Sequence, residues 1–171
     1  METPNRFLVT FGNFFYKVRN GLFPLVYLAL LLFDRPSVLF GSPVANALVL
    51  GLGAVLAVAG EFLRCLTIGY DYIKRGGRDG KVYADFLVKG GVYAHTRNPM
   101  YVGNCLIAIG LILYSGAPFA ILVLIPLFLF VYVSITSAEE AYLSGRFGDD
   151  YRDYCGRVNR YLPPPVALYR E

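Results

Sequence analysis

The sequence predicts an all-α, polytopic membrane protein with about four transmembrane helices, including a helical hairpin, and with interfacial amphipathic helices near both ends. Of its 171 residues 56% are hydrophobic and only 16% are charged, whereas soluble domains carry about 25% charged residues. The apolar residues form long runs, which is typical of membrane spans. Positive charge also falls almost entirely on one side of these runs. We therefore expect one integral membrane domain over residues 1–171.

The first predicted helix, residues 5–19, is an amphipathic helix at the membrane interface. Its apolar residues recur at helical spacing: Phe7, Leu8, Phe11, Phe14 and Phe15. Residues 21–33 form an apolar run that is short, because a span takes about 20 residues. We expect it to span with the help of a snorkelling Arg19, before a turn at residues 34–36.

The second predicted span, residues 44–60, contains small residues that allow close helix packing: Gly51, Gly53, Ala54, Ala57 and Gly60. Glu61 and Arg64 follow it at a spacing that lets them pair. Residues 61–100 then form a polar, basic connector on the cytosolic side.

Residues 101–138 predict a transmembrane hairpin. Two apolar segments, 101–114 and 118–135, are joined by so short a turn that the helices should be antiparallel, and Pro126 predicts a kink in the second. The cytosolic tail, 139–165, contains Gly148 as a helix end, Asp149 as an N-cap and Pro163 as a stop. Between them a short amphipathic helix is expected from its apolar spacing: Tyr151, Tyr154, Cys155, Val158 and Leu162.

The charge distribution predicts the orientation in the membrane. With four spans, all of the 16 Lys and Arg residues except Arg35 lie on the side of the two termini. This positive-inside pattern places both termini in the cytoplasm, in a bacterial inner membrane or the endoplasmic reticulum. In a membrane protein, the net charge of +4 indicates contact with anionic lipid rather than with nucleic acid. We expect no metal site and no disulfide framework, because there is one histidine and an odd number of cysteines without a CxxC pair.

The stretch "GVYAHTRNPMYVGN", residues 91–104, contains the first candidate site. Asn98 is a favoured N-cap and Pro99 suits the first helical position, so a helix N-terminus here can attract an anion. Arg97 adds a cation, and aromatic or polar groups surround it: Tyr93, His95 and Tyr101. The alternative is that Asn98 only caps a transmembrane helix, with Arg97 snorkelling and the tyrosines forming an interfacial belt.

The second candidate site is the pair Glu139 and Glu140, which the hairpin returns to the same membrane face. Because adjacent residues lie about 100° apart around a helix, one carboxylate can face a pocket while the other pairs with a basic residue. The alternative is a solvated pair at the rim. Together the two sites would suit S-adenosylmethionine, whose sulfonium can also be attracted by aromatic rings, although nucleotides share several of its groups.

Two groups of residues resemble motifs of the isoprenylcysteine carboxyl methyltransferase and phospholipid methyltransferase superfamily. The first matches G-x-Y-x-x-x-R-[HN]-P-x-Y-x-G and comprises Gly91, Tyr93, Arg97, Asn98, Pro99, Tyr101 and Gly103. The second matches E-E…F-G-x-x-Y-x-x-Y…V-x-R and comprises Glu139, Glu140, Phe147, Gly148, Tyr151, Tyr154, Val158 and Arg160. The resemblance covers about residues 60–165.

The resemblance implies an integral membrane methyltransferase that uses S-adenosylmethionine at the cytosolic leaflet. It implies that the cofactor is bound by Gly91, Tyr93, His95, Arg97, Asn98, Tyr101, Gly103, Glu139 and Glu140. Arg97, His95 and Glu140 are the candidate catalytic residues. Asn98 replaces the histidine of the prenylcysteine enzymes, which argues more against a prenylcysteine substrate than against the cofactor.

The methyl acceptor stays open, as a membrane lipid or a lipidated or small hydrophobic molecule that presents a carboxylate, an amine or a thiol. Arg146 and Arg157, besides Arg97, are cations that could bind a carboxylate acceptor. For an amine or thiol a proton must leave, and His95 is the ordinary base at neutral pH. The favoured alternative is that His95 serves as a hydrogen-bonding residue in its loop. Two alternatives are an NADPH-dependent enzyme like the membrane sterol reductases, whose C-terminal sequence is similar, and a non-catalytic membrane scaffold.

Overall fold

The computed structural model describes residues 5–33, 37–38, 41–70, 82 and 84–163. Its elements, in order, are α1 (Arg6–Phe33), α2 (Pro43–Tyr70), the 3₁₀-helix η2 (Gly91–Ala94), α3 (Pro99–Tyr114), α4 (Pro118–Phe147) and α5 (Asp149–Arg157). All described elements are helical, as the sequence predicts. The expected turn at 34–36 and residues 71–81 and 83 of the connector lie outside the described part.

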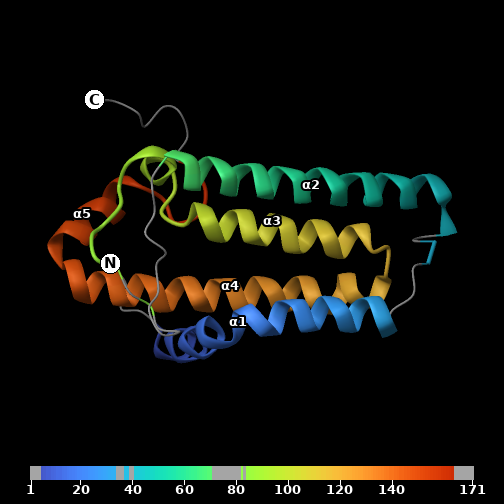
Figure 1. Ribbon diagram of the computed structural model, residues 1–171, viewed down its shortest axis with the longest axis horizontal. Helices are drawn as coiled ribbons and strands as arrows, with labels where there is room; N and C mark the ends of the chain where they lie inside the picture. The colour runs from blue at the N-terminus through green and yellow to red at the C-terminus, as the bar shows by residue number, and fades with distance from the viewer. Residues whose placement is uncertain (1–4, 34–36, 39–40, 71–81, 83, 164–171) are drawn as a thin grey trace.

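The four long helices form two antiparallel pairs that lie against each other (Figure 1). α2 packs most extensively against α3, and α1 against α4, while α3 and α4 share a smaller contact. The predicted hairpin of α3 and α4 is therefore present, joined by a turn in which Gly116 has a positive φ of 63°. Each of its two helices, however, has its main partner outside the hairpin. This arrangement leaves the looser interface between the two pairs.

Small residues set the close contact between α2 and α3. A Cβ added to Gly60 would lie 2.6 Å from the carbonyl oxygen of Gly103, and one added to Gly110 would lie 2.5 Å from the nitrogen of Ala57. The two backbones thus touch, as in other membrane helix pairs. The expectation of close packing is confirmed for Gly53, Ala57 and Gly60, whereas Gly51 is exposed on the outer face.

The predicted interfacial helix and first span are joined in one helix, α1, which corrects the separation expected at residue 20. Figure 1 shows that the beginning of α1 runs in a different direction from the rest. Pro24 lies inside α1, and a proline there removes a backbone hydrogen bond and bends the helix. The helix continues because both parts pack on α4, through ring contacts of Phe15 with Phe130 and of Phe23 with Phe128.

The helix lengths identify two candidate membrane spans, 43–69 and 118–147. α4 runs through Pro126 and past the apolar segment that ends at residue 135, and it ends before Gly148, as predicted. α3, with 16 residues, rises only about 24 Å, which is shorter than the roughly 30 Å hydrocarbon core. The structure thus supports two spans by length and composition, and four spans stay a prediction.

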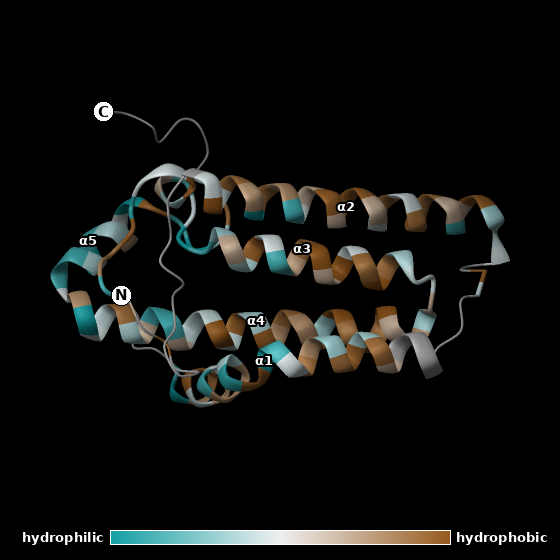
Figure 2. Cartoon of the chain, viewed as in Figure 1, coloured by the Kyte–Doolittle hydropathy of each residue, from teal (hydrophilic) through white to brown (hydrophobic). Residues whose placement is uncertain are grey.

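Large apolar side chains cover the outer faces of the long helices. On α2 they form one stripe at intervals of three and four residues: Val44, Leu48, Leu52, Val55, Val58 and Phe62. A continuous exposed apolar surface of this kind marks contact with a membrane or a partner. Figure 2 shows the hydrophilic residues gathered at the end of the bundle where α5 and the segment around residues 86–98 lie. The polar candidate residues are therefore at one end of a membrane-associated bundle.

The helix in the tail is shorter than predicted. α5 begins after Gly148, which is the N-cap, so Asp149 is the first helical residue rather than the cap. Tyr151, Tyr154 and Val158 are buried as expected, but Leu162 is exposed. The chain becomes extended at Val158 because the residues that follow bind the loop before α3 instead of continuing the helix.

We predict that Gly60→Ala destabilises the protein by about 1–3 kcal/mol, because the added methyl group must push α2 away from the backbone of α3. The matched control is Gly51→Ala on the same helix, where nothing lies within 4 Å of the added Cβ. This control should be neutral or slightly stabilising, since alanine is the better helix former. Thermal unfolding in detergent measures both, and equal stabilities of the two variants would contradict the packing argument.

Candidate functional site

Residues 96–98, just before α3, are hydrogen-bonded to residues 159–161 of the tail that follows α5. The backbone N–H of Arg97 donates to the carbonyl of Asn159 at 3.0 Å, and the Thr96 hydroxyl donates to the carbonyl of Tyr161 at 3.0 Å. The Asn98 side-chain amide donates to the carbonyl of Arg160 at 3.1 Å. These bonds satisfy polar groups of two buried residues, Thr96 and Asn98, and fix the start of α3 against the tail.

Asn98 is the N-cap of α3 and Pro99 its first residue, which confirms both predictions. Its side chain does not cap the helix in the usual way, because it makes no bond to the N–H groups of the first turn. Instead, Nδ2 donates to Oε1 of Glu140 at 3.1 Å. The start of α3 and the last part of α4 are thus in direct contact, as the hairpin predicts.

Glu140 is the centre of this contact. Besides the bond from Asn98, its Oε2 lies 3.0 Å from Nε of Arg160, and its Oε1 lies 3.7 Å from Nη1 of Arg97. Its side chain is 18% exposed, so these interactions are only partly screened by solvent. We call Arg97, Asn98, Glu140 and Arg160 the Glu140 cluster. Its two guanidinium groups and one carboxylate leave an excess of one positive charge.

Glu139 points to a different set of partners. Its carboxylate hydrogen-bonds with the hydroxyl group of Tyr101 on α3. That hydroxyl also accepts a hydrogen bond of 3.2 Å from Nη1 of Arg19 on α1, and Arg19 lies over the ring of Tyr16. The expectation that the two adjacent carboxylates serve different surroundings is confirmed, although Glu140 is the one that pairs closely with basic residues.

Two buried tyrosines of α5, Tyr151 and Tyr154, lie beside the Glu140 cluster. The hydroxyl of Tyr154 donates to the carbonyl of Tyr93 at 2.6 Å, which attaches α5 to η2. Burial, and then the Glu140 carboxylate, raise the pKa of Tyr151, so that hydroxyl stays neutral. Burial, the largest single influence, favours a neutral Arg97, but Glu140 together with Cys155 and Tyr151 outweighs it and raises the pKa of the guanidinium. Arg97 is therefore a permanent cation in this site.

Three other predicted residues lie around this cluster rather than in it. Gly91 begins η2 with a positive φ of 55°, a backbone conformation that favours glycine. His95 follows η2, is exposed, and donates its backbone N–H to Val92. Gly103 is buried against Gly60 and the side chain of Arg64, where its small size serves the contact of α2 with α3.

The two arginines expected to bind an acceptor lie on the surface. Arg146 is exposed in the last turn of α4. Arg157 is exposed on α5, and its Nε donates to the carbonyl of Asp153 at 3.4 Å. The structure does not bring either of them to Glu140 through any contact among the described residues.

Sequence reasoning missed four residues that the structure places at the site. Arg160 was part of a recognised motif, so the V-x-R spacing was a signal for it. Arg19 was expected only to snorkel, and nothing in the sequence links it to Tyr101. Cys155 accepts a hydrogen bond of 2.6 Å from Nη1 of Arg97, and Thr96 holds the tail. Their roles depend on the packing of α5 and α1, which the sequence pattern does not specify.

We predict that Glu140→Ala destabilises the protein by about 2–4 kcal/mol, because it leaves Arg97 and Arg160 without their shared partner. The matched control is Asp150→Ala, which removes the carboxylate that pairs with Lys89 at a side-chain exposure of 59%. An exposed pair contributes at most about 1 kcal/mol. Unfolding in detergent at fixed lipid content measures the stability of both variants. An equal loss of stability in the two would contradict the prediction.

Comparison with known proteins identifies the family. The phospholipid methyltransferase family matches residues 47–150, which include most of α2, all of α3 and α4, and the residues around Asn98 and Glu140. The chain is also 40% identical over 79 residues to a protein-S-isoprenylcysteine O-methyltransferase of Schizosaccharomyces pombe. That alignment covers 45% of this chain and 33% of the relative, so the chain spans about a third of the relative's length. No solved structure matches the chain. Since the family match covers more than half of the sequence, the chain belongs to the phospholipid methyltransferase family of membrane methyltransferases.

Proposed function

We propose that this protein transfers a methyl group from S-adenosylmethionine to a lipidic or small hydrophobic acceptor at the cytosolic leaflet. The observation that carries the proposal is the 3.1 Å contact between Nδ2 of Asn98 and Oε1 of Glu140. It joins two motifs that lie 42 residues apart into one polar site. Family membership supplies the reaction class, and the site supplies groups suited to the methyl donor.

The charges of the Glu140 cluster fit S-adenosylmethionine. The carboxylate of S-adenosylmethionine would suit the excess positive charge of Arg97 and Arg160, because guanidinium groups bind carboxylates through charge-assisted bonds. Arg97 Nε is buried and has no hydrogen-bond partner in the described part of the chain, so the site has a donor available. The ammonium group would suit Glu140 or Glu139, and Tyr101 offers an aromatic face for a sulfonium.

When bound, S-adenosylmethionine would supply a methyl group on a sulfonium, whose departure leaves a neutral thioether. The protein is then needed mainly to hold the reactants in line and to exclude water. Arg97 and Glu140 would orient the donor, and Asn98 would hold the Glu140 carboxylate in place. If the acceptor is an amine or a thiol, His95 is the candidate base, and its exposed position would let it pass a proton to solvent.

The proposed membrane arrangement has α1 to α4 crossing the bilayer with both termini in the cytoplasm. The exposed apolar stripe of α2 and the polar residues at one end of the bundle support it. The shorter α3 would cross where the bilayer thins or where its ends snorkel, each at modest cost. The beginning of α1, which bends away from its remainder, would lie at the cytosolic interface.

The acceptor is proposed only as a class. The family takes its name from phospholipids, and the yeast relative is named for isoprenylcysteine, so both point to lipid-linked molecules. The NADPH-dependent alternative is not favoured, because both matches name methyltransferases. A scaffold that keeps the fold without chemistry stays a second possibility, which binding and turnover measurements separate.

We predict that the purified protein in detergent binds S-adenosylmethionine and not NADPH. Arg97→Gln should weaken this binding about tenfold or more, because a charge-assisted bond to the carboxylate is lost. The matched control, Arg152→Gln, removes an exposed arginine of α5 and should bind as the wild type does. Calorimetry measures the binding of both ligands to the wild type and to each variant. Equal affinity of the two variants, or preferred binding of NADPH, would contradict the assignment.

We also predict methyl transfer from radiolabelled S-adenosylmethionine into a lipid-extractable product when total membrane lipid is added. Mass spectrometry of the labelled species then identifies the acceptor. His95→Ala should reduce turnover strongly if the acceptor loses a proton, and should leave it unchanged if the acceptor is a carboxylate. Binding of the donor without any labelled product would favour the scaffold.

A further inference from the structure

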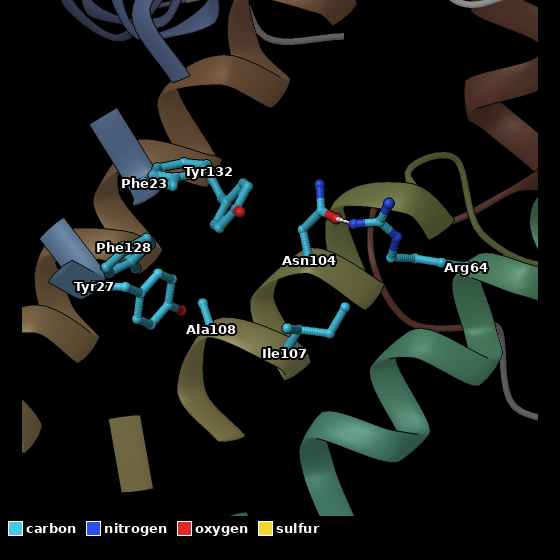
Figure 3. A pocket seen from close by; sticks show the side chains of 8 residues that line it. All are labelled: Phe23, Tyr27, Arg64, Asn104, Ile107, Ala108, Phe128 and Tyr132. Carbon is cyan, nitrogen blue, oxygen red and sulfur yellow. Dashed lines mark hydrogen bonds between the residues drawn. The ribbon is translucent and has the colours of Figure 1, made fainter. Parts of the chain in front are cut away.

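A cavity of about 160 Å³ lies between the two helix pairs. Figure 3 shows its lining, to which α1 contributes Phe23 and Tyr27, α2 Arg64, α3 Asn104 and α4 Phe128 and Tyr132. It thus occupies the looser interface of the bundle, away from the glycine contact of α2 with α3. None of these residues belongs to the Glu140 cluster, so the cavity is separate from the site described above.

The polar groups at the cavity are mainly hydrogen-bond donors. Nη1 of Arg64 donates to Oδ1 of Asn104 at 2.6 Å, which uses the acceptor of that amide and leaves its two N–H donors. In Figure 3 the Asn104 amide nitrogen points away from Arg64, and the hydroxyls of Tyr27 and Tyr132 point into the space between the helix pairs. A ligand that complements these groups must accept hydrogen bonds.

Two of these donors have no partner. Nε of Arg64 and the hydroxyl oxygen of Tyr27 are buried and make no hydrogen bond within the described part of the chain. Glu61 forms the predicted ion pair with Arg64, but its Oε2 lies 3.7 Å from Nε, which is too far for a hydrogen bond, and its side chain is 61% exposed. Buried donors are nearly always satisfied in native proteins, so these two atoms point to a missing acceptor. The fixed charge of Arg64 favours an anionic one.

The rest of the lining is apolar and the volume is small. The rings of Phe23 and Phe128 are tilted by 40° to each other with centroids 5.0 Å apart, and Ala108, which also lines the cavity, is 3% exposed. The cavity has room for about five water molecules by their share of liquid volume. This is enough for an acidic head and the first carbons of a chain, and the remainder of a longer ligand would extend between the helices into lipid.

The cavity adjoins the candidate site through two tyrosines. The ring of Tyr132, which lines the cavity, lies 6.3 Å from the ring of Tyr101. Tyr101 in turn hydrogen-bonds with Glu139. A molecule in the cavity would therefore have its head one aromatic layer away from the carboxylate pair.

We propose that this cavity binds the acidic head, a carboxylate or a phosphate, of a hydrophobic molecule, with Arg64 and Asn104 as its polar contacts. If the proposed methyltransferase function holds, this molecule is the methyl acceptor, and only its identity as the acceptor rests on the proposed function. The binding itself follows from the cavity, its donors and its apolar wall.

The test uses the full chain in nanodiscs of zwitterionic lipid at pH 8, titrated by calorimetry with octanoate, octyl phosphate and octanol, with empty nanodiscs subtracted. Octanoate or octyl phosphate should bind at least tenfold more tightly than octanol, and the tighter of the two identifies the head. Arg64→Met keeps the aliphatic stem that packs on Gly103 and should weaken the acid about tenfold without affecting octanol. Arg152→Met, the matched loss of an exposed arginine, should have no effect.

Filling the cavity is the second test. Ala108→Leu should abolish octanoate binding, whereas Ala59→Leu on the exposed face of α2 should preserve it. Equal binding of acid and alcohol, or octanoate binding that survives both Arg64→Met and Ala108→Leu, would overturn the proposal and leave the cavity to water. Titration of the same samples with S-adenosylmethionine separates the two proposals. In the wild-type protein, donor binding without acid binding refutes only the cavity proposal, and acid binding without donor binding refutes only the proposed function.

Discussion

The pairing of the Glu140 carboxylate with Asn98, Arg97 and Arg160 is the interaction on which the rest of the site depends. It brings together three segments that are distant in sequence: the start of α3, the last part of α4 and the extended tail after α5. A half-buried carboxylate has to be compensated by donors. Here α4 carries the carboxylate, the start of α3 contributes two donors and the tail contributes one. Removing any one of these partners therefore destabilises the contact among all three segments.

The bundle combines a tight interface with a looser one. Glycines bring the backbones of α2 and α3 into contact. This contact fixes the position of Asn98, at the start of α3, relative to α2. Between the helix pairs, large aromatic residues meet and leave a cavity with unpaired donors. A close-packed pair that positions the polar site, beside an interface that contains a cavity, would suit the proposed methyl transfer to an acceptor from the lipid.

Much of the fold followed from local signals. Asn98 and Pro99 predicted the start of α3, the short turn predicted the hairpin with α4, and the rotation between adjacent residues predicted different surroundings for Glu139 and Glu140. The joined α1 was not predicted, because the amphipathic residues 5–19 and the apolar residues 21–33 have different patterns, while packing on α4 continues through both. The early end of α5 was also not predicted, since apolar spacing carries no information about the hydrogen bonds that the tail makes with residues 96–98.

The sequence by itself determined the helical membrane class, the family, and the placement of the charged candidate residues at one end of the bundle, because these depend on composition, periodicity and motif spacing. Only the tertiary structure decided which side chains meet. The pairing of Arg160 with Glu140, the bond from Arg19 to Tyr101, and the cavity at Arg64 each join residues from different helices. Such contacts depend on how the helices are paired, and no local pattern along one chain specifies that pairing.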